Sequence, residues 1–371
     1  REVYENRLVT RNSGNSTIAD REVNFYNSIL DLSLKNKNFI PLTEKQTLEA
    51  GWSYTYEGTH FGEGEEGDSL DISQENSHRI GIYVQDEIRL TPSLSVKPGI
   101  RADYSFFLEK AYIQPRLQAS LDLSDHWRVN AVTGIYRQFI AETSVIDELG
   151  NFRYFWSLCD NLAVPVLKAV HYVGGVNFHI TGFSAGVEGF YKKTDGISRY
   201  RWIDGTLSVA QGNSRAYGMD LLLKKYFKKH ELWASYTLSL TEEHFNTMPE
   251  DVYRYAPQDQ RHEVKGAMLL NFNPFFFSAN YVYGSGFRPP SSILNNLEER
   301  YPYSRLDMAI FYRLKVKDYN FEAGISILNV LNQENIKYSN VIRIPDSPNS
   351  SISIHAEAVP FTPTIYLNMA F

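Results

Sequence analysis

The chain lacks the features that mark several common protein classes. It has one cysteine, Cys159, among 371 residues, so it cannot form an internal disulfide. It has no run of about 18 consecutive apolar residues, which excludes a helical membrane span. Positive charge is not in excess, because 37 Lys and Arg residues stand against 43 Asp and Glu residues, for a net charge of −6. No basic stripe stands out, so nucleic acid is not an expected partner.

Aromatic residues, in contrast, are abundant. The chain has 25 Tyr and 22 Phe, and aromatic residues make up 14% of it. Such residues favour strands and also form the interfacial girdles of membrane β-barrels. The first twenty residues are polar and contain no signal peptide. Export to an outer membrane is therefore inferred from the strand pattern and not from a targeting segment.

Alternation of apolar and polar residues dominates the sequence. Between Leu94 and Phe106 one face is mainly apolar and the other is polar, and residues 305–316 and 232–240 behave similarly. A period of two residues is that of a β-strand. These segments run to roughly 10–14 residues, while soluble strands average about 5–6 and tilted membrane strands need about 9–11. The length therefore favours strands that cross a bilayer.

The links between strands alternate in length. The sequence predicts strands over residues 2–10, 22–36, 47–59, 79–90, 93–106, 111–123, 127–139, 168–180, 183–194, 214–227, 231–243, 261–272, 275–286, 303–316, 319–331 and 362–371. Short turns alternate with the long links 60–78, 140–167, 195–213, 244–260, 287–302 and 332–361. Two links depart from this parity, since 106–111 is short and 37–46 is long. Short turns on one rim and long loops on the other are typical of outer-membrane barrels.

The final strand supports the same fold. Residues 364–371 alternate strictly and stop on Phe371, as the last strand of an outer-membrane barrel does; an ordinary strand that happens to end on Phe is the alternative. The predicted fold class is all-β, an antiparallel transmembrane β-barrel with about 16 strands in this chain.

Several stretches resemble the barrel of TonB-dependent outer-membrane receptors. Residues 83–104 carry the pattern YVQDE, then two leucines, then GIRADY, and residues 327–332 (ILNVLN) resemble the family's NLFN motif. Residues 212–220 (GNSRAYGMD) are similar to a further family strand, with Asp220 in place of Glu. Residues 259–262 (DQRH) and 283–289 (YGSGFRP) also fit. The five matches occur in the same order as in the family, and their sequences resemble those of receptors of the Bacteroidetes.

The resemblance implies a larger protein. Such receptors have 22 strands and an N-terminal plug domain, so residues 1–371 would be a partial barrel domain. The plug, the first six strands and the TonB box would precede Arg1, and the chain could not transport by itself. The implied function is energy-coupled uptake of a scarce bulky nutrient of the siderophore, heme, cobalamin or glycan class at the bacterial cell outer membrane. The implied partners are outer-membrane lipid, the TonB complex acting through the plug, the nutrient and, with glycans, a surface lipoprotein. No cofactor is expected.

Two sets of residues are candidates for function. The first consists of polar residues at the alternate strand positions that are predicted to face the lumen: Arg101, Asp103, Arg116, Glu188, Arg305 and Asp307. Their side chains would face the plug or the ligand, or would only solvate one another. The second belongs to long links expected on the outside, where aromatic and Arg side chains would contact ligand or would pack the loops together: Phe152, Arg153, Tyr154, Phe155, Trp156, Tyr200, Arg201 and Trp202.

Two other functions stay open. A complete 16-stranded diffusion porin has this length and would need a constricting loop folded inward. An outer-membrane barrel hydrolase would need a Ser/His or Asp/His cluster on the outer rim. The sequence predicts neither catalytic residues nor a metal site. His171 and His179 share a strand face, but at about 3.3 Å per residue they lie roughly 26 Å apart, too far to hold one zinc ion.

Overall fold

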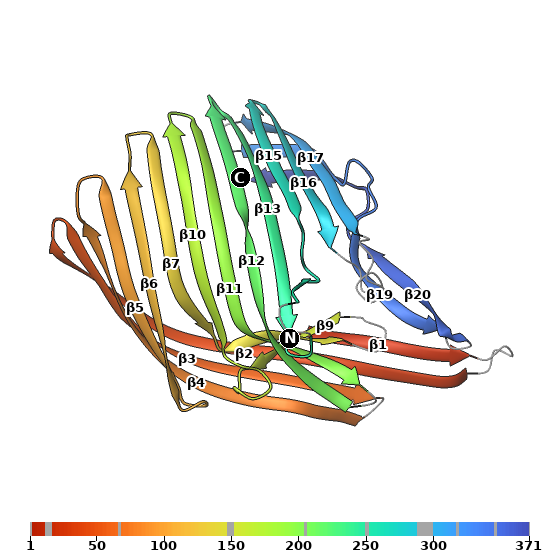
Figure 1. The fold of residues 1–371 in the computed structure, drawn as a ribbon. Coiled ribbons are helices and arrows are strands. Elements are labelled where there is room, and N and C mark those ends of the chain that lie inside the picture. The colour runs from red at the N-terminus through yellow and green to blue at the C-terminus, as the bar shows by residue number, and fades with distance from the viewer. Residues whose placement is uncertain are drawn as a thin grey trace.

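The structure, a computed structural model, is a single large antiparallel sheet curled into a partial barrel (Figure 1). It describes residues 2–11, 17–65, 68–146, 152–203, 206–248, 252–287, 300–316, 319–344 and 347–370. Within these ranges every regular element is a strand. The all-β prediction is confirmed.

Sixteen strands follow one another around the sheet as a meander, each paired with the next along the chain. Their bounds are β1 (Glu2–Arg11), β2 (Thr17–Thr43), β3 (Gln46–Glu65), β4 (Asp68–Arg89), β5 (Leu94–Ser105), β6 (Lys110–Asp122), β7 (Trp127–Gln138), β10 (Leu167–Ile180), β11 (Phe183–Ile203), β12 (Thr206–Phe227), β13 (His230–Phe245), β15 (His262–Phe272), β16 (Phe275–Phe287), β17 (Tyr301–Val316), β18 (Tyr319–Leu328) and β21 (Thr362–Ala370). This matches the expected strand count.

Five further strands lie within the long links. These are β8 (Ile140–Ile146), β9 (Phe152–Leu158), β14 (Arg254–Tyr255), β19 (Ile336–Ile344) and β20 (Ser347–Glu357). β8 and β9 form a hairpin, and β19 and β20 form a separate one. In the sequence-based prediction these segments belong to the long links.

Three of the predicted links were wrong in their extent. The link 37–46 is a tight turn, since β2 runs to Thr43 and β3 starts at Gln46. Most of 60–78 and 195–213 is strand, because the hairpins β3–β4 and β11–β12 continue far beyond the rest of the sheet. Strand pairing in such hairpins continues through polar segments, where the alternation of hydrophobicity fades. The short link at 106–111 is confirmed as a turn between β5 and β6.

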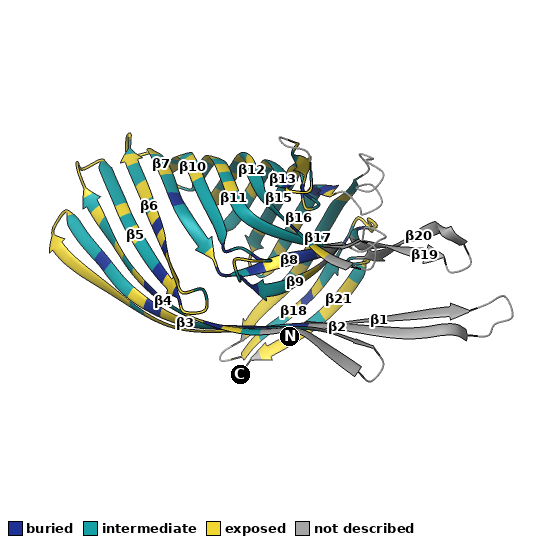
Figure 2. Ribbon diagram, turned by 60° about the horizontal axis from the view of Figure 1, so that its bottom comes forward, coloured by how far each residue is buried: buried dark blue, intermediate teal, exposed yellow. Residues whose placement is uncertain are grey.

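The sheet is apolar on the outside and polar on the inside. On β3, the side chains of Ser53, Thr55 and Glu57 are 4–5% exposed, while Trp52 and Tyr54 are 43% and 38% exposed. Figure 2 shows exposed residues alternating with intermediate and buried ones along many strands of the sheet. A water-soluble protein buries its apolar side. The pattern is instead that of a barrel wall with lipid outside and a wet lumen inside.

The strands extend to different levels at the rim that carries the long links. β5 and β6 are joined by a short turn at residues 106–109, while β2, β3 and β4 continue well past that level. β11 and β12 are similarly tall. The rim that carries the long links (the long-link rim) therefore has a low point at β5–β7 between two tall walls.

Candidate functional site

A buried network of charges lines the inner face of β3–β6. Asp103, 1% exposed, accepts hydrogen bonds from Arg101 Nε at 2.6 Å and Arg101 Nη2 at 2.7 Å. Arg79 Nη1 also donates to it at 3.3 Å, and Gln114 Nε2 donates at 2.5 Å. Arg79 in turn donates to Glu57 at 2.6 Å. Two carboxylates and two guanidiniums thus neutralise one another, which is how buried charge is tolerated.

The network lines a polar cavity of about 310 Å³ on the inner face of β2–β7. Its walls include Lys35, Ser53, Gln114 and Arg137 beside the charged network. The guanidinium of Arg137 lies 5.5 Å from the ring centre of Tyr112, and its Nε is buried without a hydrogen-bond partner among the described residues. The cavity therefore holds donor capacity that a polar group of a ligand, a plug segment or water could use.

Arg79 and Arg137 were not predicted as site residues. Arg79 has the lumen-facing parity but lies at the start of its predicted strand, where the alternation was short. From the alternation of residues along β7, Arg137 would be expected on the outer face. However, the regular pairing of β7 with β6 ends at Gly134, and the Gln114 side chain accepts a hydrogen bond from the Arg137 backbone N–H at 3.0 Å. This separation of the strands brings Arg137 to the cavity, and no sequence signal marks it.

The predicted lumen residues do not form one cluster. Arg101 and Asp103 belong to the network on β5, while Arg305 and Asp307 form a separate pair on β17, joined by hydrogen bonds of 2.8 and 2.7 Å. Arg116, on β6, lies 5.5 Å from the ring centre of Tyr136 and shows no ion pair within the described residues. Glu188 lies on β11 opposite Asp220 of β12. The structure therefore distributes these groups over several strands of the wall.

The β8–β9 hairpin (residues 140–158) folds into the concave side of the sheet (Figure 2). β8 runs parallel to β11 over residues 144–146 and 199–201. β9 lies against the inner faces of the tall strands on the other side: Asn27 of β2 bonds the backbone of Trp156, and Thr59 of β3 bonds that of Leu158. This inward loop connects the two tall walls above the charged network.

Part of the predicted aromatic set gathers at this hairpin. The ring of Phe155 stacks on Phe61 with centres 4.5 Å apart and lies 5.5 Å from the ring of Tyr200. Tyr154 is 46% exposed, and Trp156 is half-buried. The structure thus brings Phe155 and Tyr200, which are far apart in sequence, into one cluster. The side chains of Phe152, Arg153, Arg201 and Trp202 lie outside the described part of the structure.

Acidic groups flank the aromatic cluster. Burial and the nearby Asp160 carboxylate raise the pKa of Glu75. Burial, followed by the charges of Asp160 and Glu75, raises the pKa of the Tyr200 hydroxyl. Cys159 beside them is 2% exposed, and burial raises the pKa of its thiol to about 12. A protonated, buried thiol is unreactive.

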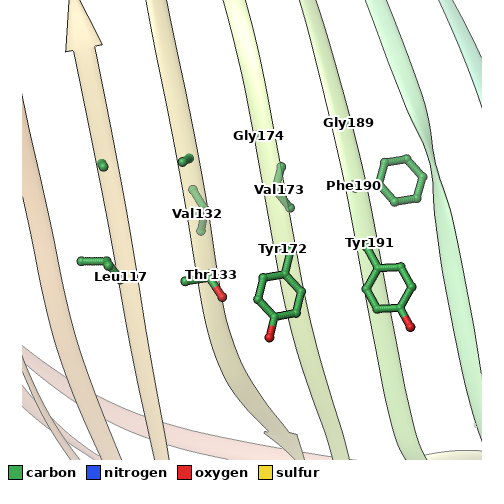
Figure 3. A pocket seen from close by; sticks show the side chains of 11 residues that line it. Leu117, Val132, Thr133, Tyr172, Val173, Gly174, Gly189, Phe190 and Tyr191 are labelled. Carbon is green, nitrogen blue, oxygen red and sulfur yellow. The ribbon is translucent and has the colours of Figure 1, made fainter.

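One depression on the surface belongs to the outer face. It has a volume of about 550 Å³ and lies over β6, β7, β10 and β11 (Figure 3). It follows a row of small residues, Ala119, Ala131, Gly174 and Gly189, which pair across the four strands. Tyr172 and Tyr191 border the row. Its lining is mainly apolar and suits lipid chains.

Two searches for other kinds of site were negative over the residues that the structure describes. No group of three or more His, Cys, Asp or Glu side chains is placed to hold a metal ion. No helix in that part of the chain is long and apolar enough to cross a membrane.

Comparison with known proteins defines the class. Residues 2–330 match the family described as "TonB dependent receptor-like, beta-barrel". The chain belongs to this family, as the motifs in the sequence indicated. The family and the structural neighbours below are receptors and transporters. A search of curated proteins finds no match.

Solved structures of similar fold are all distant in sequence. The ferric preacinetobactin receptor BauA of Acinetobacter baumannii has a TM-score of 0.62 at 12% identity, covering 94% of this chain and 55% of its own. The ferric citrate transporter FecA gives 0.60 at 13%, covering 94% and 55%. The ferric yersiniabactin uptake receptor FyuA of Yersinia pestis gives 0.59 at 12%, covering 94% and 54%. This chain therefore spans about half the length of the structures it resembles, and at this identity the likeness concerns the fold.

Proposed function

We propose that the chain is the C-terminal barrel portion of an outer-membrane receptor that takes up a scarce, bulky nutrient by TonB-coupled transport. The observation that carries the proposal is the family match over residues 2–330 on a sheet with an apolar outer face and a polar inner face. The nutrient belongs to the siderophore, heme, cobalamin or glycan class. The protein is a transporter and not an enzyme.

Residues 1–371 form a partial barrel domain in this proposal, preceded by the first strands and a plug. Two strand edges support it. Over the described part of the chain, β1 pairs with β2 only over Thr17–Asn27, so residues 28–43 of β2 pair with β3 alone. Within the described residues β21 pairs with β18 alone. Unpaired strand edges are costly in lipid, so further strands are required to close the wall.

The lumen and the loops take separate roles. The polar inner wall, with Arg101, Asp103, Arg116, Glu188, Arg305 and Asp307, faces the plug and the path of the ligand. The ligand is first held at the outer rim by a set of aromatic and Arg side chains: Phe152, Arg153, Tyr154, Phe155, Trp156, Tyr200, Arg201 and Trp202. Of these, Tyr154 is 46% exposed, and aromatic residues are frequent in binding hot spots.

The partners follow from the same proposal. Outer-membrane lipid covers the apolar face, and the TonB complex acts through the plug. A surface lipoprotein takes part if the nutrient is a glycan. The long-link rim faces the outside of the cell.

Growth of a deletion strain tests the function. Cells lacking the gene, with and without the full-length gene restored, are grown on one limiting source at a time: a ferric siderophore, heme, cobalamin or a glycan. We expect growth on one source to fail without the gene and to fail equally when TonB is removed. Uptake that continues without TonB and rises linearly with concentration would instead show a diffusion porin. Breakdown of the source by the purified protein would show a hydrolase.

A further inference from the structure

Residues 140–146 and 152–166, here called the crossbar, join two walls of the sheet that are distant in the strand order. The crossbar comprises the β8–β9 hairpin and the turn that leads to β10. One side of it lies on β2–β4 and the other on β11, so it spans the low point of the rim (Figure 2). A loop in this place either opens and closes or is a permanent part of the rim, and its contacts distinguish the two.

The attachment to β2 and β3 uses backbone groups of the crossbar. Asn27, 6% exposed, donates from Nδ2 to the carbonyl of Trp156 at 3.0 Å and accepts from the Trp156 N–H at 2.9 Å. The hydroxyl of Thr59, 4% exposed, accepts from the Leu158 N–H at 3.4 Å. A side-chain amide that satisfies both backbone groups of one residue acts like a strand pairing. Opening here would leave buried polar groups without partners, which is costly.

The attachment to β11 extends the sheet itself. β10 leaves β11 at Asp195, and Gly196, with φ +95°, marks a bulge there. Beyond the bulge β8 takes the place of β10 as the neighbour of β11. Arg199 Nε donates to the Ser144 hydroxyl at 3.2 Å, and Arg199 Nη2 donates to Glu243 at 2.7 Å. The crossbar is therefore continuous with the wall at this end.

An apolar core fixes the base of the crossbar. Phe139, Cys159, Val164 and Val166 are each at most 5% exposed and pack with Tyr112 of β6. The Asn161 side chain donates to the Tyr112 hydroxyl at 2.9 Å. Beneath this core, the Arg79 guanidinium lies 4.4 Å from the Phe139 ring centre. The base thus contacts Arg79, which also lines the polar cavity.

We propose that the crossbar is a fixed partition that stays docked throughout the transport cycle, so that the nutrient passes beside it. This proposal rests on the function proposed above. It makes the crossbar a determinant of how large a nutrient can pass, and not a lid. The reason is that its contacts are buried at both ends and at the base, whereas segments that move have few buried contacts.

Cys159 is a natural probe of this docking, because it lies at the end of β9 inside the core. The full-length receptor in intact cells is treated with N-ethylmaleimide, and modification of the peptide that contains Cys159 is followed by mass spectrometry. We expect no modification over the time that fully modifies an unfolded sample, in cells with and without TonB. Fast modification of Cys159, or modification that depends on TonB, would overturn the proposal and show a moving lid.

Two variants and a matched control test the anchor. Asn27→Ala should speed modification of Cys159 about tenfold or more, equivalent to about 1.4 kcal/mol. Thr59→Val removes one hydroxyl with little change of shape and should act in the same direction if Asn27→Ala fails to fold. Asn38→Ala, on the same strand but away from the crossbar, should leave the rate unchanged. An unchanged rate in the first two variants would refute the anchor.

The labelling experiment separates this proposal from the proposed function. Modification of Cys159 is measured without any nutrient, so it reports docking even if the protein is not a TonB-dependent transporter. The growth experiment, in turn, can succeed whether or not the crossbar moves.

Discussion

Replacing Asp103 by Asn tests the charged network of the inner wall. Asp103→Asn removes the negative charge that holds Arg101, whose two contacts of 2.6 and 2.7 Å are charge-assisted hydrogen bonds. Hydrogen bonds to charged groups contribute about 1.5–3 kcal/mol, and breaking a fully buried pair costs about 3–5 kcal/mol. Arg101 is 23% exposed and Arg79 keeps its bond to Glu57. We therefore expect a loss of about 2–3 kcal/mol.

The measurement is urea unfolding of the full-length receptor in lipid vesicles, compared with the unmodified protein. Asp195→Asn serves as the control, because Asp195 pairs with Lys193 at 3.5 Å and is 42% exposed. Exposed pairs contribute only about 0–1 kcal/mol. If Asp103→Asn lost no more stability than Asp195→Asn, the network would not hold the wall and the reasoning would be wrong.

Three further changes have defined outcomes. Asn329→Ala should lower the free energy of unfolding by about 2–3 kcal/mol, because the fully buried amide donates to two carbonyls at 2.9 Å and φ is +51°; thermal unfolding measures this. Gly81→Ala should lower the free energy of unfolding as Asp103→Asn does, because a Cβ would collide with Arg101 and Asp103. In urea unfolding, the loss of stability in the double variant should be smaller than the sum of the two single losses. Cys159→Ala should remove a pH dependence of the free energy of unfolding. The pKa of the Cys159 thiol is raised to about 12 from an ordinary 9, so this group stabilises the folded state fully below pH 9, and the stabilisation is lost as the pH rises toward 12. At pH 10.5 the unmodified protein should have lost about 2 kcal/mol through this group, and unfolding of both proteins at pH 8 and 10.5 checks it.

Much of the barrel wall could be predicted from the sequence because its signal is local. In the segment from Leu94 to Phe106 each residue's face follows from its parity, and Arg101 and Asp103 share the inner face of the sheet. Parity fails where strands separate. Arg137 reaches the cavity because β7 leaves β6 above Gly134, and only the paired strands show that break.

The candidate site was less predictable, because its parts come from distant positions. Phe155 and Tyr200 were expected in two different loops, and the structure stacks Phe155 on Phe61 of β3 and places it near Tyr200. Asn27, which holds the crossbar, lies 129 residues from Trp156 and resembles any polar strand residue in the sequence. Whether these aromatic side chains contact a nutrient stays a prediction.

The sequence by itself determined the all-β class, the order of the strands around the wall and the family, since alternation, turn length and short motifs act over neighbouring residues. Tertiary structure alone decided the height of each strand, the inward path of the link between β7 and β10, and the pairing of Asp103 with Arg79 and Gln114. These depend on contacts between strands, whose energies arise only when the sheet has formed. The fold of the barrel wall can thus be predicted from local sequence patterns, whereas the shape of the long-link rim cannot.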